Sequence, residues 1–211
     1  MNKNNVDYTL YFCTDRTLMS CYSVEKSVEL AIDGGASVIQ LREKNLSSRD
    51  FYETALSVLQ ITKPRGVPLI INDRLDICLA AGADGVHLGQ SDIPCSVARK
   101  ILGNEKIIGV SSHNPAEALR AQADGADYLG VGAAFSTHTK TDVDVLPEGE
   151  LKKICDAVDV PVVAIGGIHK DNILQLKGSG ADGVALVSAI FGAEDIEAEC
   201  RELKALAEQI I

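Results

Sequence analysis

Eight short apolar runs alternate with helix-length segments along the 211 residues, and this alternation restricts the fold more than any other feature. The runs are rich in Val, Ile, Leu and Ala, as is typical of parallel strands that are buried on both faces. They span residues 8–13, 38–41, 68–71, 86–88, 106–110, 128–131, 161–165 and 184–187. We therefore predict an α/β protein with a closed (βα)8 TIM barrel. An open doubly wound sheet is the alternative, because alternation alone does not prove closure.

A weak internal repeat agrees with the count of eight strands. A Gly-Ala turn ends a helical pattern before the second, fourth, sixth and eighth runs, at residues 33–37, 81–85, 124–127 and 179–183. Glycine suits the left-handed conformation that ends many helices, and alanine lets a helix end pack close to a sheet. No linker or low-complexity tract divides the chain, so we expect one barrel domain over residues 1–211.

Charge and composition exclude several classes of partner. The formal net charge is −10 and no basic stripe is present, which argues against nucleic acids and acidic membranes as partners. No apolar run approaches the roughly 20 residues of a membrane span, and residues 1–7 lack the apolar core of a signal peptide. Six cysteines without paired or zinc-type spacing favour a reducing, cytoplasmic location. The sequence leaves a homo-oligomer open.

Two cations follow the second strand, at the rim where barrel enzymes carry their active sites. Arg42 and Lys44 are two residues apart, so in an extended chain their side chains share a face and can point at one anion. Taken alone, the pair is equally compatible with a solvated loop in which Glu43 is a surface partner.

Two carboxylates follow the next two strands. Asp73 comes directly after Asn72 at the end of the third strand, and Asp92 lies just beyond the fourth. Two carboxylates completed by substrate oxygens and water are typical of Mg²⁺. As structural alternatives, Asp73 pairs with Arg74 or caps the next helix, and Asp92 caps the helix opened by Pro94. Together with the cations, the carboxylates favour a Mg²⁺-bound diphosphate.

Later strand ends carry groups suited to phosphate. Residues 136–142 combine hydroxyl donors with Lys140 in a long loop after the sixth strand. A Gly-Gly pair at 166–167 follows the seventh strand and Val187-Ser188 follows the eighth, where these barrels often bind phosphate. The glycines are also compatible with a tight turn, but their position in the barrel favours phosphate. No Ser-His-Asp or Cys-His spacing supports a protein nucleophile, and we expect His87 to line the barrel and His113 to face the site.

In this order along one chain, the motifs resemble the thiamine-phosphate synthase family over almost the whole length. The matching segments are residues 40–44, 71–74, 82–90 with Asp92, 109–111, 137–140, 165–168 and 187–190. One departure is visible, because the family usually has proline where this chain has Ser136, and losing proline loosens the entrance to that loop.

The resemblance implies a transferase that joins 4-amino-5-hydroxymethyl-2-methylpyrimidine diphosphate to 4-methyl-5-(2-phosphoethyl)thiazole. It implies dissociative loss of Mg²⁺-bound diphosphate and capture of the pyrimidine cation by the thiazole nitrogen, with Asp73 and Asp92 holding the Mg²⁺. The residues implied for the pyrimidine diphosphate are Gln40, Arg42, Lys44, Asn72, Ser111 and Lys140, of which Arg42, Lys44, Ser111 and Lys140 are expected to be catalytic. Those implied for the thiazole phosphate are Thr137, Thr139, Gly167, Val187 and Ser188.

Three other functions remain open at this point. A thiazole tautomerase of the same fold would use a phosphate site without a metal-bound diphosphate, with His113 as its acid or base. A non-catalytic barrel that senses thiamine phosphates would lose the metal carboxylates, yet both are present. A sugar-phosphate isomerase agrees with the fold alone, but its acid–base pair is not evident.

Overall fold

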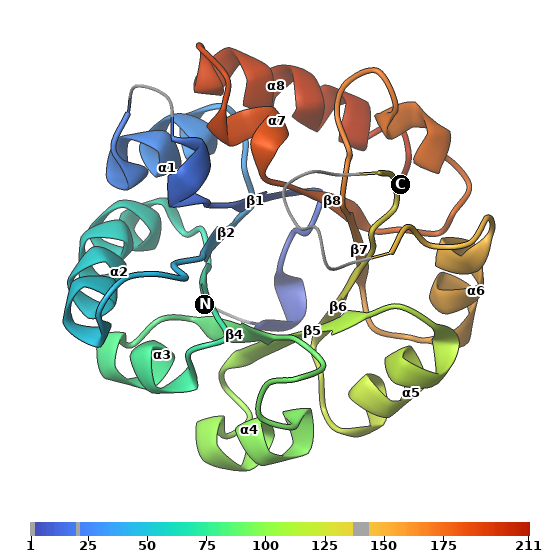
Figure 1. Ribbon diagram of the computed structural model, residues 1–211, viewed down its shortest axis with the longest axis horizontal. Helices are drawn as coiled ribbons and strands as arrows, with labels where there is room; N and C mark the ends of the chain where they lie inside the picture. Colours follow the sequence, from blue (N-terminus) through green and yellow to red (C-terminus); the bar gives the residue numbers. More distant parts are fainter. Residues whose placement is uncertain (1–2, 20–21, 137–143) are drawn as a thin grey trace.

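The computed structural model describes residues 3–19, 22–136 and 144–211, and these form a closed barrel of eight parallel strands (Figure 1). The strands are β1 (Leu10–Cys13), β2 (Val38–Leu41), β3 (Leu69–Asn72), β4 (Gly85–Leu88), β5 (Ile107–Ser112), β6 (Tyr128–Val131), β7 (Val162–Ile165) and β8 (Gly183–Leu186). Each strand pairs with its neighbours in sequence, and β8 pairs with β1. The predicted (βα)8 barrel is confirmed, and the open sheet is excluded.

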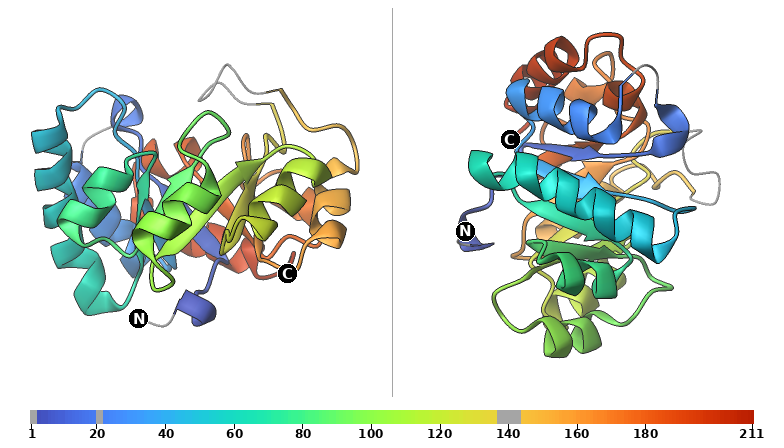
Figure 2. Two further views of the ribbon diagram at one scale, coloured as in Figure 1. Left: turned by 90° about the horizontal axis from the view of Figure 1, so that it is seen from below. Right: turned by 90° about the vertical axis from the view of Figure 1, so that its left-hand side faces the viewer.

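Helices form a ring around the strands, as two further views show (Figure 2). They are α1 (Val24–Asp33), α2 (Ser48–Thr62), α3 (Leu75–Ala81), α4 (Cys95–Leu102), α5 (Pro115–Ala123), α6 (Glu150–Ala157), α7 (Ser188–Phe191) and α8 (Ile196–Ala207), with 3-10 turns η1 (Lys3–Asn5), η2 (Arg16–Leu18), η3 (Lys63–Arg65) and η4 (Ile173–Leu176). Between β7 and β8, where every residue is described, the single turn η4 replaces a full α-helix. No helix in the described ranges is long and apolar enough to cross a membrane.

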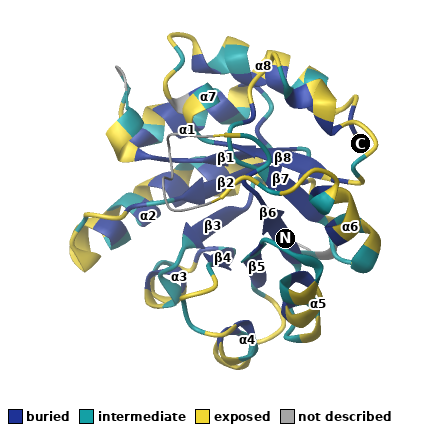
Figure 3. Cartoon of the chain, turned by 45° about the vertical axis from the view of Figure 1, so that its right-hand side comes forward, coloured by how far each residue is buried: buried dark blue, intermediate teal, exposed yellow. Residues whose placement is uncertain are grey.

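Two apolar layers hold the barrel together. The larger layer lies between the strands and the inner faces of the helices, whose outer faces are exposed (Figure 3). The smaller layer fills the barrel interior, where the rings of Tyr8 and Tyr11 pack on Tyr128 with centroid distances of 4.9 and 5.7 Å. Gly109 on β5 makes room for this stack, because a Cβ there would lie 2.1 Å from Cζ of Tyr128.

The internal repeat has a structural cause at the amino-terminal ends of the strands. In each of the four turns, one polar residue forms two hydrogen bonds with the strand that precedes the turn. The backbone N–H of Asp84 donates to the carbonyl of Leu69 at 3.0 Å, and the N–H of Leu69 donates to the Asp84 carboxylate at 2.9 Å. The same reciprocal pair joins Ser37 to Leu10, Asp127 to Ile108 and Asp182 to Val162. The repeated side chain therefore satisfies a strand-end N–H that the sheet leaves unpaired.

We predict that Asp84→Ala lowers the free energy of unfolding by about 1–2 kcal/mol, because the Leu69 N–H loses its acceptor. Urea unfolding followed by circular dichroism measures this loss. Asp84→Asn is the matched control, since its amide oxygen keeps an acceptor in place and should retain most of the stability. An Asp84→Ala protein that unfolds at the wild-type urea concentration would contradict this explanation of the repeat.

Candidate active site

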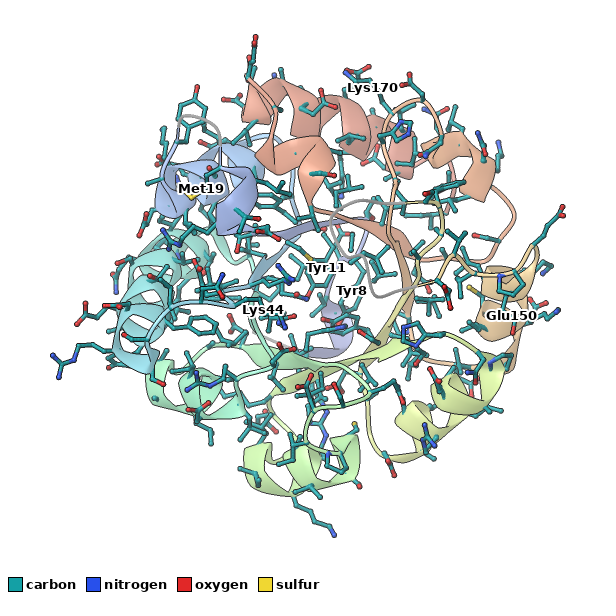
Figure 4. All side chains as sticks on the ribbon, in the orientation of Figure 1. Tyr8, Tyr11, Met19, Lys44, Glu150 and Lys170 are labelled. Carbon is teal, nitrogen blue, oxygen red and sulfur yellow. The ribbon has the colours of Figure 1, made fainter. Side chains whose placement is uncertain are left out.

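A cavity of about 440 Å³ opens at the carboxyl ends of the strands. Ten of the predicted site residues line it, namely Gln40, Arg42, Lys44, Asn72, Asp73, Asp92, Ser111, Gly167, Val187 and Ser188. The other three, Thr137, Thr139 and Lys140, lie outside the described residues. Figure 4 shows Lys44 and Tyr11 near the barrel axis, whereas Glu150 and Lys170 lie at the periphery. The structure thus gathers strand-end residues that are far apart in the sequence.

Both cations that follow β2 reach the cavity, and each contacts a carboxylate. Lys44 Nζ lies 2.5 Å from Oδ2 of Asp73, so it contacts a residue that follows the neighbouring strand β3. Arg42 Nη1 donates to Oδ2 of Asp15 at 2.6 Å, and its side chain is 22% exposed. The backbone N–H of Arg42 also donates to Thr14 Oγ1. These contacts fix the guanidinium to the loop after β1 while leaving part of it open to a ligand.

The alternative of a solvated loop with Glu43 as a surface partner is wrong. The Glu43 side chain is only 2% exposed, and Arg16 contacts both of its carboxylate oxygens, at 2.7 and 3.1 Å. Because side chains alternate along an extended segment, Glu43 turns into the protein while its neighbours on either side turn toward the cavity. The buried ion pair therefore anchors the segment that carries Arg42 and Lys44.

The two carboxylates meet at the same rim. Asp73 has a left-handed backbone, with φ of 61°, which Asp adopts more readily than most residues do. Burial raises the pKa of Asp92 above its ordinary value, and the nearby Asp73 carboxylate adds to that rise. The N–H of Gly89, which donates to Asp92 Oδ2 at 2.7 Å, and the Lys44 ammonium oppose it. The negative charge of Asp73 therefore acts on the Asp92 carboxylate.

Neither structural alternative for these carboxylates is found. Helix α3 begins after Arg74 without a side-chain cap, and Arg74 pairs with Asp76 at 2.6 Å. Helix α4 begins after Pro94, again without a side-chain cap. Asp73 and Asp92 are thus not used as caps at the starts of these helices.

The carboxylate pair suits a hard divalent cation that takes most of its ligands from elsewhere. Mutual repulsion and burial disfavour two adjacent negative charges, and a cation between them relieves both effects. Carboxylate oxygens from one or two residues are the usual protein contribution to Mg²⁺, with the remaining positions taken by water and substrate phosphates. The described ranges contain no group of three or more His, Cys, Asp and Glu side chains that could hold a metal alone. The arrangement therefore fits Mg²⁺ that enters with a phosphate-bearing ligand.

The loops after β7 and β8 border the other side of the cavity. Gly166 and Gly167 have φ of 99° and 65°, and a Cβ on Gly167 would lie 2.4 Å from the carbonyl oxygen of Ser136. The glycines thus form a tight turn, which the sequence offered as the alternative to a phosphate site. They also line the cavity beside Val187 and Ser188, so the turn does not exclude a phosphate there.

Sequence reasoning missed several residues that line the cavity, among them Tyr11, Cys13 and Tyr128. The signal was available in the alternation along β1 and β6, because every second side chain of a barrel strand points inward. Burial raises the pKa of the Cys13 thiol to about 12, so this cysteine is not a thiolate nucleophile at neutral pH.

His87 and His113 lie where the sequence predicted. His87 lies inside the barrel, with Nδ1 2.9 Å from the Tyr128 hydroxyl and Nε2 3.0 Å from Ser111 Oγ. His113 lines the cavity, and its Nδ1 lies 3.0 Å from a Glu117 carboxylate oxygen.

The fold and the site together define a class: a (βα)8-barrel enzyme whose strand ends present cations, paired carboxylates and a glycine turn to one cavity. The family described as thiamine monophosphate synthase matches residues 10–190, and the chain belongs to this family. The thiamine-phosphate synthase of Clostridium botulinum (strain Eklund 17B) is 55% identical over 202 residues, which cover 96% of this chain and 95% of that protein. The enzyme of the same name from Clostridium beijerinckii is also 55% identical, over 96% of this chain and 97% of its own.

A solved structure agrees with these relatives. The thiamine phosphate pyrophosphorylase from Pyrococcus furiosus superimposes with a TM-score of 0.89 at 41% identity, covering 99% of this chain and 98% of that one. A 3-hexulose-6-phosphate synthase at 21% identity, with a TM-score of 0.65, shares the fold alone.

We predict that Asp73→Asn lowers the pKa of Asp92, because it removes the neighbouring negative charge that helps to raise that pKa. Carbon-13 NMR titration of the Asp92 carboxylate, without divalent cations, measures the change. Asp76→Asn is the control, since Asp76 pairs with Arg74 and does not contribute to the Asp92 shift. Identical Asp92 titration curves in wild type and Asp73→Asn would show that the two carboxylates do not interact.

Proposed function

We propose that this chain condenses 4-amino-5-hydroxymethyl-2-methylpyrimidine diphosphate with 4-methyl-5-(2-phosphoethyl)thiazole, giving thiamine phosphate and diphosphate. The observation that carries the proposal is the convergence of Arg42 and Lys44 with Asp73 and Asp92 at one cavity. Family membership and 55% identity to thiamine-phosphate synthases over 96% of the chain support it.

Asp73 and Asp92 are the residues that would hold Mg²⁺ against the diphosphate. When bound, the ion would neutralise negative charge on the leaving group as a Lewis acid. Lys44, which contacts Asp73, brings a further positive charge to the same place. Arg42 stays positioned by Asp15, so its guanidinium needs little rearrangement to receive phosphate oxygens.

The reaction needs charge stabilisation and orientation more than proton transfer. The bond between the pyrimidine methylene carbon and the diphosphate oxygen breaks, and its electron pair leaves with the diphosphate. The electron-rich aminopyrimidine stabilises the methylene cation, and the lone pair of the thiazole nitrogen then forms the new C–N bond. Arg42, Lys44 and Lys140 would stabilise the charge that develops on the diphosphate. No protein nucleophile is required, in agreement with the protonated Cys13 thiol.

Binding roles divide between two sides of the cavity. We assign the pyrimidine diphosphate to Gln40, Arg42, Lys44, Asn72, Ser111 and Lys140. We assign the thiazole phosphate to Thr137, Thr139, Gly167, Val187 and Ser188. In the first group, Gln40, Asn72 and Ser111 lie at the carboxyl ends of β2, β3 and β5, and the other members come after β2 and β6 in the sequence. The second group comes after β6, β7 and β8, so the reacting atoms would meet over the barrel axis.

The test is incubation with both precursors, with and without Mg²⁺, followed by detection of thiamine phosphate and released diphosphate. The proposal expects both products in equal amounts and only with the metal. A thiazole tautomerase would convert its thiazole without Mg²⁺ and without releasing diphosphate. The two clostridial relatives are thiamine-phosphate synthases and do not support that alternative. Absence of thiamine phosphate under all conditions would overturn the proposal.

We also propose that the chain works as one catalytic domain in the cytoplasm on small molecules alone, without nucleic acid or membrane. Closure of the sheet from β1 to β8 supports the single domain. The net charge of −10 supports the absence of nucleic-acid partners. Five described cysteines are free thiols, as is usual in a reducing compartment.

We predict that Arg42→Ala lowers kcat/KM by about one to two orders of magnitude, since a hydrogen bond to a charged group contributes about 1.5–3 kcal/mol. Lys140→Ala should have an effect of similar size. Steady-state assays of diphosphate release measure both changes. Arg65→Ala is the control, because Arg65 contacts Glu29, does not line the cavity and should keep wild-type kinetics. Normal turnover and affinity in both Arg42→Ala and Lys140→Ala would refute these roles.

A further inference from the structure

A chain of hydrogen bonds crosses the barrel beneath the cavity. Gln40 Nε2 donates to the Tyr11 hydroxyl at 2.9 Å, and the Tyr11 and Tyr128 hydroxyl oxygens are 2.7 Å apart. Tyr128 Oη lies 2.9 Å from His87 Nδ1, and His87 Nε2 lies 3.0 Å from Ser111 Oγ. The five side chains come from β2, β1, β6, β4 and β5, so the chain ties five strands together.

Because the members of this hydrogen-bonded chain are buried, the position of each hydrogen affects the free energy of the folded state. Tyr128 and Tyr11 are 0% and 1% exposed, and Gln40 and His87 are 6% and 9% exposed. Burial raises the pKa of both tyrosines well above the ordinary value, so each keeps its hydroxyl hydrogen. A buried hydroxyl hydrogen without an acceptor is costly, so the arrangement that satisfies every hydrogen is favoured.

Only one direction of donation along the hydrogen-bonded chain, from Gln40 toward Ser111, gives every donor an acceptor. The Gln40 amide nitrogen can only donate, so the Tyr11 oxygen accepts from it. If Tyr128 also donated to Tyr11, the hydrogen of Tyr11 would have no acceptor among the described contacts. Tyr11 therefore donates to Tyr128, and Tyr128 donates to His87 Nδ1. The remaining hydrogen of the imidazole is then on Nε2, where it donates to Ser111 Oγ.

The direction of donation decides what the hydroxyl of Ser111, the last member of the hydrogen-bonded chain, can offer to a ligand. Because Ser111 Oγ accepts from His87, the hydrogen of the Ser111 hydroxyl is not used by His87 and can point into the cavity. In the opposite direction, Ser111 would donate to His87 and offer only lone pairs to a ligand. A hydroxyl that donates suits an anionic phosphate oxygen, whereas one that offers lone pairs repels it.

We propose that Tyr128 is a positioning residue, which orients His87 so that Ser111 acts as a hydrogen-bond donor toward the bound pyrimidine diphosphate. This inference rests on the proposed function for the identity of the ligand. Two glycines make room for the arrangement: Gly109 beside the Tyr128 ring, and Gly130, where a Cβ would lie 3.0 Å from His87 Cε1.

The test compares two variants that each remove one buried hydroxyl from the same aromatic stack. Tyr128→Phe breaks the chain at its centre. Tyr8→Phe is the matched control, because the Tyr8 ring also packs on Tyr128 but its buried hydroxyl has no hydrogen-bond partner in the part of the protein that is described. We expect Tyr128→Phe to lower kcat/KM by roughly tenfold, and Tyr8→Phe to stay within about twofold of wild type.

A double-mutant cycle separates positioning from a general structural effect. If Tyr128 acts through Ser111, adding Tyr128→Phe to Ser111→Ala should cause little further loss of kcat/KM. If Tyr128 only supports the fold, the two losses should multiply, and the proposal fails. It also fails if Tyr128→Phe and Tyr8→Phe have equal kinetics.

A direct measurement does not depend on activity at all. Nitrogen-15 NMR of the His87 ring in the wild-type protein should show the proton on Nε2 and an unprotonated Nδ1 that accepts a hydrogen bond. In Tyr128→Phe, the signal of the hydrogen bond to Nδ1 should be lost. A proton on Nδ1 in wild type would reverse the direction of the chain and overturn the inference. Failure of the proposed function would appear separately, as a wild-type protein that forms no thiamine phosphate.

Discussion

Pairing of β8 with β1 is the constraint on which the rest of the structure depends. Because all strands are parallel, their eight carboxyl ends lie at the same rim, and closure of the sheet arranges them in a ring around one cavity. Residues separated by more than a hundred positions, such as Arg42 and Ser188, then line the same cavity. At the opposite rim, closure leaves strand-end N–H groups to be satisfied, and the reciprocal bonds of Ser37, Asp84, Asp127 and Asp182 do so. The repeat and the site are thus two consequences of one topology.

Cations held in fixed positions at the rim explain how a protein with a net negative charge can bind an anionic substrate. Screening at physiological salt acts within roughly 8 Å, so the groups at the rim outweigh distant surface charges. Each cation is held by a carboxylate, Arg42 by Asp15 and Lys44 by Asp73, and the backbone beneath them is anchored by buried Glu43. Charges that are fixed before the substrate arrives need little reorganisation during the reaction, which is the basis of electrostatic catalysis.

The barrel interior combines packing with polar order. Three tyrosine rings fill the centre, yet two of their hydroxyls belong to a hydrogen-bonded chain that ends at the cavity. A buried polar chain is favourable only when every donor finds an acceptor, and this requirement gives the chain a direction. Tyr11 and Tyr128 therefore fill the barrel interior with their rings and, through their hydroxyls, are hydrogen-bonded to residues that line the cavity.

The sequence by itself determined the strand count, the position of most strands to within two residues, and the strand-end residues that carry charge. These features depend on local patterns: apolar runs, glycine turns and the residue types that follow each run. Only the tertiary structure decided which carboxylate each cation contacts, that Glu43 is buried, and that Tyr11 and Tyr128 join His87 beneath the site. The physical reason is that these contacts link different strands across the barrel, and their partners are set by closure and by the register between strands.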